Sequence, residues 1–183
     1  MVVQPLMPLR PYQEQAIASV RIAVMQTNRA LLVMPTGSGK TVVFSEICRL
    51  ACDKNRKVLI LVHRRELVTQ ASDKLRKAGV EHGIIAAGFD PSEHPVQVAS
   101  VQTLIRRLNS GSFTPDLIII DEAHHAVSGS WDKIIARFSQ ARIIGVTATP
   151  SRLDGRGLGS HFSTLVSGPS VEQLTKLGFL SPH

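Results

Sequence analysis

The stretch "LLVMPTGSGKTVV", Leu31 to Val43, decides the fold of this chain. An apolar run ends at Pro35, two glycines follow among small polar residues, and Lys40 and Thr41 open a helical pattern. Glycines allow successive backbone N–H groups to turn inward at a helix N-terminus, where the peptide dipoles also favour an anion. The sequence therefore predicts a strand, a phosphate-binding loop and a helix, in that order.

Met34 departs from the strict loop pattern G-x-x-x-x-G-K-[ST], which has glycine at that position. Met34 is the last strand residue in this register, so its side chain needs only to point into the core. A nucleotide would bring its β- and γ-phosphates to Lys40 and its magnesium ion to the Thr41 hydroxyl. A Gly-rich turn without a ligand is the alternative. The predicted nucleotide contacts in the loop are Pro35, Thr36, Gly37, Ser38, Gly39, Lys40 and Thr41.

The composition is that of one globular domain with a basic surface. The chain has 183 residues, 43% of them hydrophobic, which is enough for one core. A net charge of +7 favours a polyanionic partner such as nucleic acid, although ordinary solubility charge explains it as well. Cys48 and Cys52 lie one helical turn apart and indicate reduced thiols. Apolar runs fall far below the roughly 20 residues that span a bilayer, so we expect a cytoplasmic protein without a membrane segment.

Nearly continuous apolar runs alternate with amphipathic patterns along the chain. Runs without polar alternation are typical of strands that are covered on both faces. Predicted strands begin at Ala30, Val58, Gly83, Val96, Leu117 and Arg142. Predicted helices cover residues 11–27, 40–53, 64–78, 101–109 and 129–139, with a last short helix in "VEQLTKLGF". This order predicts an α/β fold with a mostly parallel sheet sandwiched between helices in three αβα layers.

The stretch "LIIIDEAHH" supplies a carboxylate pair at a strand end. Asp121 follows four apolar residues, and Glu122 comes next. We expect Asp121 to hold Mg²⁺ largely through water, and Glu122 to position and deprotonate an attacking water. A lone acidic pair is usually a solvated loop start, but its occurrence after a phosphate loop favours the catalytic interpretation.

"PTGSGKT", "DEAHH" and "VTATP" in this order resemble the DExH group of superfamily 2 helicases and translocases. The resemblance covers almost the whole chain and implies a RecA-like P-loop NTPase domain that uses ATP and Mg²⁺. "LRPYQEQAI" from Leu9 resembles the adenine-recognition segment of the repair-helicase and restriction-subunit branches. It implies that Gln13 contacts the adenine edge and that Arg10 packs near the base.

Two further segments resemble the nucleic-acid motifs of this superfamily, "LVHRRELVTQ" from Leu61 and "VASVQTL" from Val98. Each begins a helix at the carboxyl end of a strand, where backbone N–H groups and cationic side chains can hold a phosphate. Such contacts position a strand without reading its sequence. Solvated helix starts are the alternative. The predicted nucleic-acid contacts are His63, Arg64, Arg65, Ser100, Gln102 and Thr103.

A third set of residues is predicted to couple the two sites. The resemblance to superfamily 2 implies that Thr147 and Thr149 link the magnesium carboxylates to the nucleic-acid face. It also implies that His124 bridges toward the γ-phosphate and a second lobe. A threonine-rich strand end and a packing histidine are the ordinary alternatives. For His125 we favour packing.

The resemblance also predicts what this chain does alone. Residues 1–183 are expected to form a single ATP-binding domain, with 164–183 leading toward an absent second RecA-like lobe that carries an arginine finger. The piece is expected to be monomeric, to bind nucleotide and to have little ATPase activity. DNA is favoured over RNA as the partner. The alternatives are an RNA helicase lobe and a non-catalytic nucleic-acid-binding module, which has no need for Thr41, Asp121 and Glu122 together; a metabolic kinase would lack "DEAHH" followed by "TATP".

Overall fold

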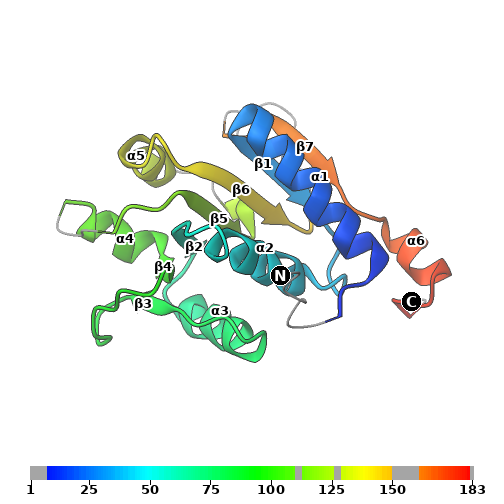
Figure 1. The fold of residues 1–183 in the computed structure, drawn as a ribbon, viewed down its shortest axis with the longest axis horizontal. Helices are drawn as coiled ribbons and strands as arrows, with labels where there is room; N and C mark the ends of the chain where they lie inside the picture. Colours follow the sequence, from blue (N-terminus) through cyan, green and yellow to red (C-terminus); the bar gives the residue numbers. More distant parts are fainter. Residues whose placement is uncertain (1–7, 110–112, 126–128, 150–160, 182–183) are drawn as a thin grey trace.

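Seven strands form one sheet in the computed structural model, which describes residues 8–109, 113–125, 129–149 and 161–181. Every strand pair is parallel, and the order across the sheet is β3-β4-β2-β5-β6-β1-β7 (Figure 1). The strands are β1 (Arg29–Val33), β2 (Val58–Val62), β3 (Gly83–Ile85), β4 (Val96–Ser100), β5 (Leu117–Asp121), β6 (Arg142–Thr147) and β7 (Thr164–Ser167).

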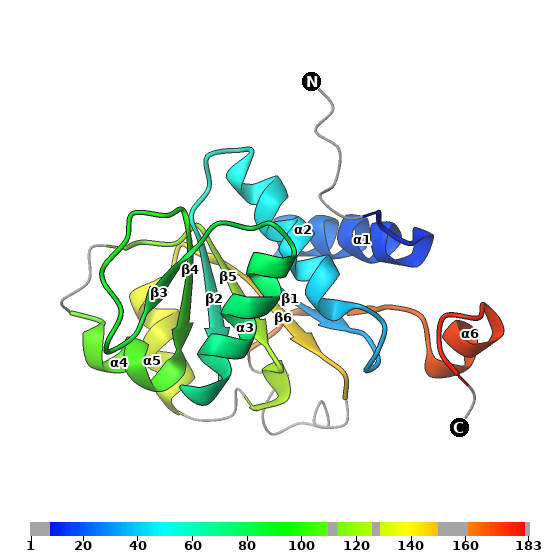
Figure 2. The ribbon, with the colours of Figure 1, turned by 90° about the horizontal axis from the view of Figure 1, so that it is seen from below.

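Helices cover both faces of the sheet, so the predicted three-layer α/β fold is confirmed. One buried cluster joins the sheet to α1 (Pro11–Thr27), α2 (Lys40–Cys52) and α3 (Glu66–Lys77). The other joins it to α4 (Val101–Arg107) and α5 (Gly129–Arg137). A short 3-10 helix, η1 (Ala123–His125), follows β5, and α6 (Val171–Lys176) lies at the edge of the molecule beyond α1 (Figure 2).

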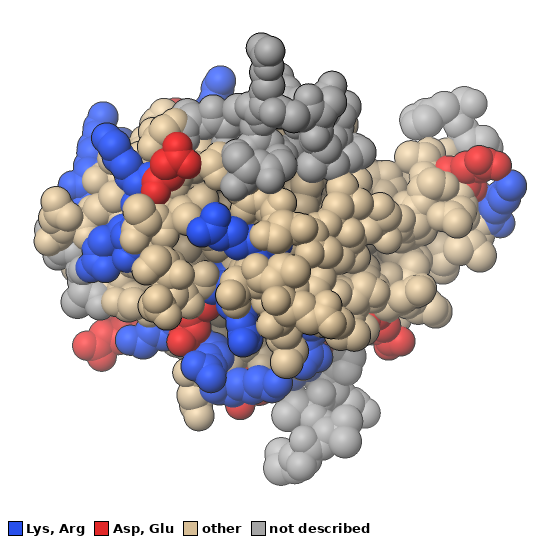
Figure 3. Space-filling model, turned by 90° about the horizontal axis from the view of Figure 1, so that it is seen from above, with Lys and Arg blue, Asp and Glu red and all other residues tan. Residues whose placement is uncertain are grey.

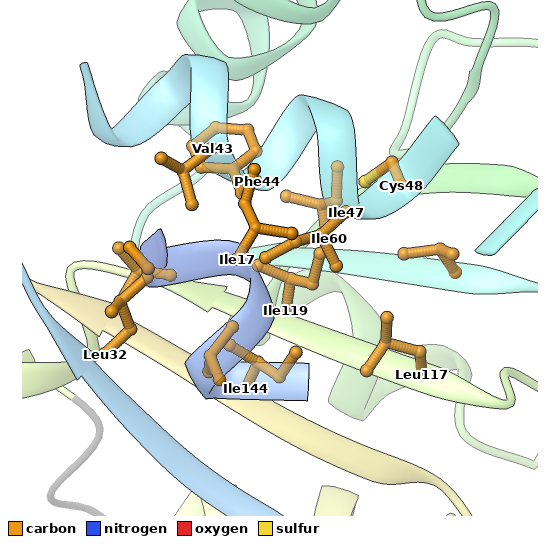
Figure 4. Close-up of a cluster of buried hydrophobic side chains, with 14 of the residues drawn as sticks. Ile17, Leu32, Val43, Phe44, Ile47, Cys48, Ile60, Leu117, Ile119 and Ile144 are labelled. Atoms are coloured by element: carbon orange, nitrogen blue, oxygen red, sulfur yellow. The ribbon is translucent and has the colours of Figure 1, made fainter. Parts of the chain in front are cut away.

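Alternation along each strand explains the continuous apolar runs. Ile60 belongs to the cluster under α2, whereas its neighbours Leu59 and Leu61 belong to the cluster under α4 and α5. Figure 4 shows Ile60 and Ile119 on adjacent strands, beneath the side chains of α2. A strand that is buried on both faces needs an apolar residue at every position, which is the pattern that the sequence displays.

The predicted elements are present, with differences at their ends and in the tail. The third helix begins at Glu66 instead of residue 64, because residues 64 and 65 form the turn that leaves β2. β7 was not predicted: its four residues alternate between exposed and half-buried, and it adds to the sheet only by pairing with β1. The sheet is therefore wholly parallel in the described part of the chain. None of the helices described is both long and apolar enough to cross a membrane.

Candidate nucleotide-binding site

The carboxyl ends of the strands meet at one edge of the sheet, because all the strands are parallel. Along this edge β4 ends at Ser100, β5 at Asp121 and β6 at Thr147. β6 lies between β5 and β1, with Asp121 level with Val146 and Val33 level with Thr147. The acidic pair after β5 and the start of the loop after β1 are therefore two strand spacings apart, about 10 Å.

The phosphate loop is closed by its own hydrogen bonds. Met34 is fully buried, as predicted, and its N–H donates to the carbonyl of Thr147 at 2.9 Å. The Pro35 carbonyl accepts from the Ser38 hydroxyl at 2.7 Å and from the Ser38 N–H at 3.2 Å. Ser38 is fully buried, so its side chain shapes the loop from within. The methionine thus ties the loop to β6 without occupying the ligand side.

Two glycines adopt backbone conformations in this loop that would be strained for any residue with a Cβ. Gly37 and Gly39 have φ of 81° and 82°, in the left-handed region. A Cβ on Gly39 would collide with the Gln13 amide, and a Cβ on Gly37 would lie 2.9 Å from a methyl group of Leu180. Lys40 and Thr41 begin α2 directly after Gly39. Backbone cradles of this kind fit a phosphate group.

Asp121 lies in a partly buried position between like and unlike charges. Burial raises the pKa of its carboxyl group, and the neighbouring Glu122 raises it further, whereas Lys74 and Lys40 act in the opposite direction. The Glu122 N–H donates to Asp121 Oδ1 at 3.0 Å. The Asp121 carboxylate is partly desolvated and interacts electrostatically with Lys40 of the loop, which fits the predicted magnesium position. Thr41, at the start of α2, fits the predicted position of a second oxygen donor.

Glu122 has an unusual backbone and leads into the predicted coupling residues. Its φ is 51°, a conformation that is costly for residues other than glycine and that concentrates at functional sites. Glu122 Oε2 lies 3.3 Å from His124 Nδ1, and the same nitrogen lies 3.0 Å from the Thr147 hydroxyl. The Thr147 hydroxyl also accepts from the Thr149 N–H and donates to its carbonyl, both at 3.3 Å. The structure thus brings His124, Thr147 and Thr149 together beside Glu122.

The predicted base-recognition residues lie against the phosphate loop. Gln13 Oε1 accepts from the Arg10 N–H at 2.9 Å, and Gln13 Nε2 donates to the Ser38 carbonyl at 3.1 Å. Gln13 is buried, and each end of its amide has one hydrogen-bonding position beyond these two bonds. Sequence reasoning missed Tyr12, whose hydroxyl donates to the same carbonyl at 2.8 Å. The only local signal was an aromatic residue between Arg10 and Gln13 in a chain with 4% aromatics.

The first predicted nucleic-acid segment follows β2 and carries exposed cations. Arg64 and Arg65 are exposed, and Arg65 Nη2 donates weakly to the Ala87 carbonyl at 3.4 Å. The His63 ring stacks on His125 with 4.8 Å between ring centroids, and His125 in turn lies 4.0 Å from His124. The contacts between these three histidine rings join the end of β2 to the end of β5. Among the described residues, no group of His, Cys, Asp or Glu is arranged to hold a metal ion by itself.

The second predicted nucleic-acid segment is arranged differently from the first. Ser100 is fully buried, and its hydroxyl caps α4 by accepting from the Thr103 N–H at 3.2 Å and donating to Thr103 Oγ1 at 3.0 Å. Its side chain therefore serves the fold. Gln102 is exposed and Thr103 is half-buried.

The wholly parallel sheet with helices on both faces defines an α/β domain of the RecA-like fold. The chain belongs to the family described as type III restriction enzyme, res subunit, whose model matches residues 6–152.

Three relatives span most of this chain. IRC3 of Saccharomyces cerevisiae, whose name classes it as an ATP-dependent helicase, is 38% identical over 179 residues, 86% of this chain and 26% of the relative. The DNA 3'-5' translocase XPB2 of Sulfurisphaera tokodaii is 31% identical over 91% of this chain and 37% of its own length. The type I restriction enzyme EcoAI endonuclease subunit of Escherichia coli is 32% identical over 95% of this chain and 23% of its own length. The chain thus spans less than two fifths of the length of these relatives.

Solved structures share the fold at low sequence identity. The type ISP restriction-modification enzyme LlaGI, solved with a DNA substrate mimic, matches with a TM-score of 0.74 and 21% identity, over 94% of this chain and 21% of that chain. The UvsW helicase of bacteriophage T4 matches with a TM-score of 0.69 and 20% identity, over 90% of this chain and 60% of the UvsW chain.

Proposed function

We propose that this chain is the ATP-binding lobe of an ATP-dependent helicase or translocase that acts on nucleic acid, with DNA favoured. The observation that carries the proposal is the shared strand edge: a glycine cradle, an acidic pair and a pair of exposed arginines follow β1, β5 and β2. Two of the relatives above bear names that refer to DNA translocation or restriction, which supports DNA as the partner.

Four side chains would carry the chemistry of ATP hydrolysis. Lys40 would bind the β- and γ-phosphates as a point charge, and Glu122 would orient the attacking water and accept its proton. Thr41 and Asp121 would hold Mg²⁺, Asp121 largely through water. The metal, when bound, neutralises charge on the phosphate oxygens.

The nucleic-acid contacts would lie on the neighbouring half of the same edge. Arg64 and Arg65 would bind phosphates after β2, with His63 beside them, and Gln102 and Thr103 would contribute at the start of α4. The chain His63–His125–His124–Thr147 would connect these contacts to Glu122, because each member touches the next. We infer that nucleotide and nucleic acid influence each other's binding along this path.

We also propose that a second RecA-like lobe completes the active site. The relatives above are more than twice as long as the part that this chain matches. Losing an arginine finger costs about 10³–10⁵ in rate, so residues 1–183 should bind ATP but hydrolyse it slowly.

Binding and turnover by residues 1–183 test these proposals separately. Lys40→Ala should abolish Mg-ATP binding measured by calorimetry, whereas Glu122→Gln should retain binding and lose the remaining hydrolysis. Unaltered ATP affinity in Lys40→Ala would refute the assignment of the loop. Strong turnover stimulated by single-stranded DNA in this chain alone would refute the need for a second lobe.

A passive nucleic-acid-binding module is separated from a motor by linkage. If the chain is part of a motor, Mg-ATP should change its affinity for DNA, and by reciprocity DNA should change its affinity for ATP. An affinity for DNA that is the same with and without nucleotide would favour the passive module. Competition between DNA and RNA of the same sequence decides which nucleic acid is preferred.

A further inference from the structure

The segment after α6 returns to the nucleotide site from the far end of the chain. Gly178 has φ of 74°, and after it the N–H groups of Phe179 and Leu180 both donate to the carbonyl of Leu174, at 2.9 and 3.3 Å. Leu174 is fully buried in the main core. This anchor fixes Phe179 and Leu180 in position, although α6 itself has only six residues.

Phe179 packs against the residues that were predicted to recognise the base. The guanidinium carbon of Arg10 lies 4.6 Å from the centre of the Phe179 ring, and the Tyr12 ring lies 5.4 Å away at an angle of 60°. Arg10 Nη1 donates to the Tyr12 hydroxyl at 3.1 Å, and that hydroxyl donates to the Ser38 carbonyl. A continuous set of contacts therefore runs from Phe179 through Arg10 and Tyr12 to the phosphate loop.

Arg10 is an exposed residue although its guanidinium contacts Phe179 and Tyr12, so a further flat group can stack on it. An arginine on the surface samples many rotamers, and ordering it on binding costs free energy. Here the Phe179 ring and the Tyr12 hydroxyl hold the guanidinium plane in advance. A planar cation between an aromatic ring and an open face suits a purine base.

We propose that Phe179 positions Arg10 for the purine base of ATP, so that the segment after α6 sets part of the affinity for the base. This inference rests on the proposed function. Phe179 acts through Arg10, whereas the hydrogen bonds that close the loop run from Ser38 to Pro35 and from Met34 to Thr147 and do not involve Phe179. Nucleotide binding and the packing of the segment after α6 are then coupled, and the coupling is reciprocal.

A ligand without a base separates this role from a general effect on the loop. We would measure the affinities for Mg-ATP and for Mg-tripolyphosphate by calorimetry on residues 1–183. Phe179→Ala should weaken Mg-ATP about threefold to tenfold, the range of an exposed or partly buried cation–π contact, and leave Mg-tripolyphosphate unchanged. Phe179→Leu, which keeps apolar bulk and loses the ring, should weaken Mg-ATP to a similar extent. Phe179→Tyr, which keeps the ring, should bind Mg-ATP as tightly as the wild-type chain.

The control and the double variant identify the residue through which Phe179 acts. Val171→Ala removes an apolar side chain from α6 that is half exposed, and should change neither affinity. Adding Phe179→Ala to Arg10→Ala should weaken ATP no further than Arg10→Ala alone, because the shared contact is already lost.

Each alternative result has a distinct meaning. Equal weakening of both ligands by Phe179→Ala, or no weakening of either, would overturn the inference and leave the proposed function standing. Additive losses in the double variant would also overturn it. Failure of the wild-type chain to bind either ligand would overturn the proposed function, and this inference with it.

Discussion

Gly39 meets two requirements at once, one from the backbone and one from a neighbour. Its φ of 82° is strained for any residue with a Cβ, and its Cα faces the Gln13 amide. Gln13 in turn bonds the Ser38 carbonyl inside the loop. The motif pattern predicted this glycine for its closeness to phosphate, whereas its contact with a glutamine 26 residues earlier follows only from the fold.

Gly39→Ala should therefore cost more than an ordinary left-handed glycine does. Gly88 is a matched control, because its φ is 83° and no atom lies within 4 Å of a Cβ placed there. Gly88→Ala should lower the free energy of unfolding by about 1–2 kcal/mol through backbone strain alone. Gly39→Ala should lose about 1 kcal/mol more as the Gln13 bond is broken, and should weaken Mg-ATP. Denaturant unfolding and calorimetry test this, and equal losses in the two variants would contradict it.

His63 gives the second prediction at the scale of one residue. Burial lowers its pKa below the ordinary 6.5, and His125, Arg64 and His124 lower it further by charge. The folded state thus disfavours the protonated ring, so this contribution to stability is present above pH 6.5 and is lost as pH falls through 6.5 toward the folded-state pKa. The His63 ring signals in an NMR titration should show a midpoint below 6.5.

Arg64→Gln should raise the NMR midpoint of His63 part of the way back toward 6.5, because burial remains. Independently, His63→Gln should reduce the loss of thermal stability between pH 7 and pH 5. A His63 midpoint at or above 6.5 in the wild-type chain would contradict the packing described for the stacked histidines.

At the scale of elements, the central strands were predictable and the edge strand was not. β2, β5 and β6 are apolar at nearly every position, because each is covered on both faces, and such runs are visible in the sequence. β7 has only four residues with alternating exposure, and its place is set by pairing with β1. Local pattern cannot reveal a pairing that depends on a partner more than a hundred residues away.

The approach to β7 shows how closely the elements fit. Phe162 precedes β7 and packs over Gly145 in the middle of β6, where a Cβ would collide with its ring and lie 2.9 Å from Leu31. Gly145→Ala should lower the free energy of unfolding by about 1–3 kcal/mol through overpacking. Adding Phe162→Leu should recover part of that loss, since the smaller side chain makes room.

Thermal or denaturant unfolding of the single and double variants measures the effect. Gly129→Ala is the control, because Gly129 begins α5 with no atom within 4 Å of a Cβ placed there, and it should leave stability unchanged or slightly higher. If Phe162→Leu gives no recovery, the contact between the ring and Gly145 does not account for the cost.

At the scale of the molecule, the site joins residues from both ends of the chain. The sequence motifs predicted the loop, the acidic pair and the coupling threonines, because each is a local pattern at a strand end. They did not predict that Phe179 lies on Arg10, since the motif that contains Arg10 is a local pattern and Phe179 lies near the other end of the sequence. Topology alone brings α6 beside the start of α1 (Figure 1).

The charge of the molecule is unevenly spread, which bears on how it binds a polyanion. On the face of the molecule that Figure 3 shows, Lys and Arg side chains gather over the left part and the lower edge, and a largely uncharged area lies to the right. A basic surface attracts nucleic acid from any direction, whereas a binding site fixes particular phosphates. Net charge and specific contacts must therefore be separated by experiment.

Salt dependence separates them. For single strands, the slope of log affinity against log salt falls by about 0.7 for each phosphate contact that is lost. Arg64→Ala/Arg65→Ala should thus make the slope for single-stranded DNA shallower by about 1.4. Arg21→Ala/Lys54→Ala removes the same charge away from the strand edge, because both residues line a pocket beside Asp116 and Arg142 at the amino ends of β5 and β6. This control should leave the slope nearly unchanged, whereas equal effects of the two pairs in fluorescence-anisotropy titrations would mean that the overall field, and no strand-end site, holds the DNA.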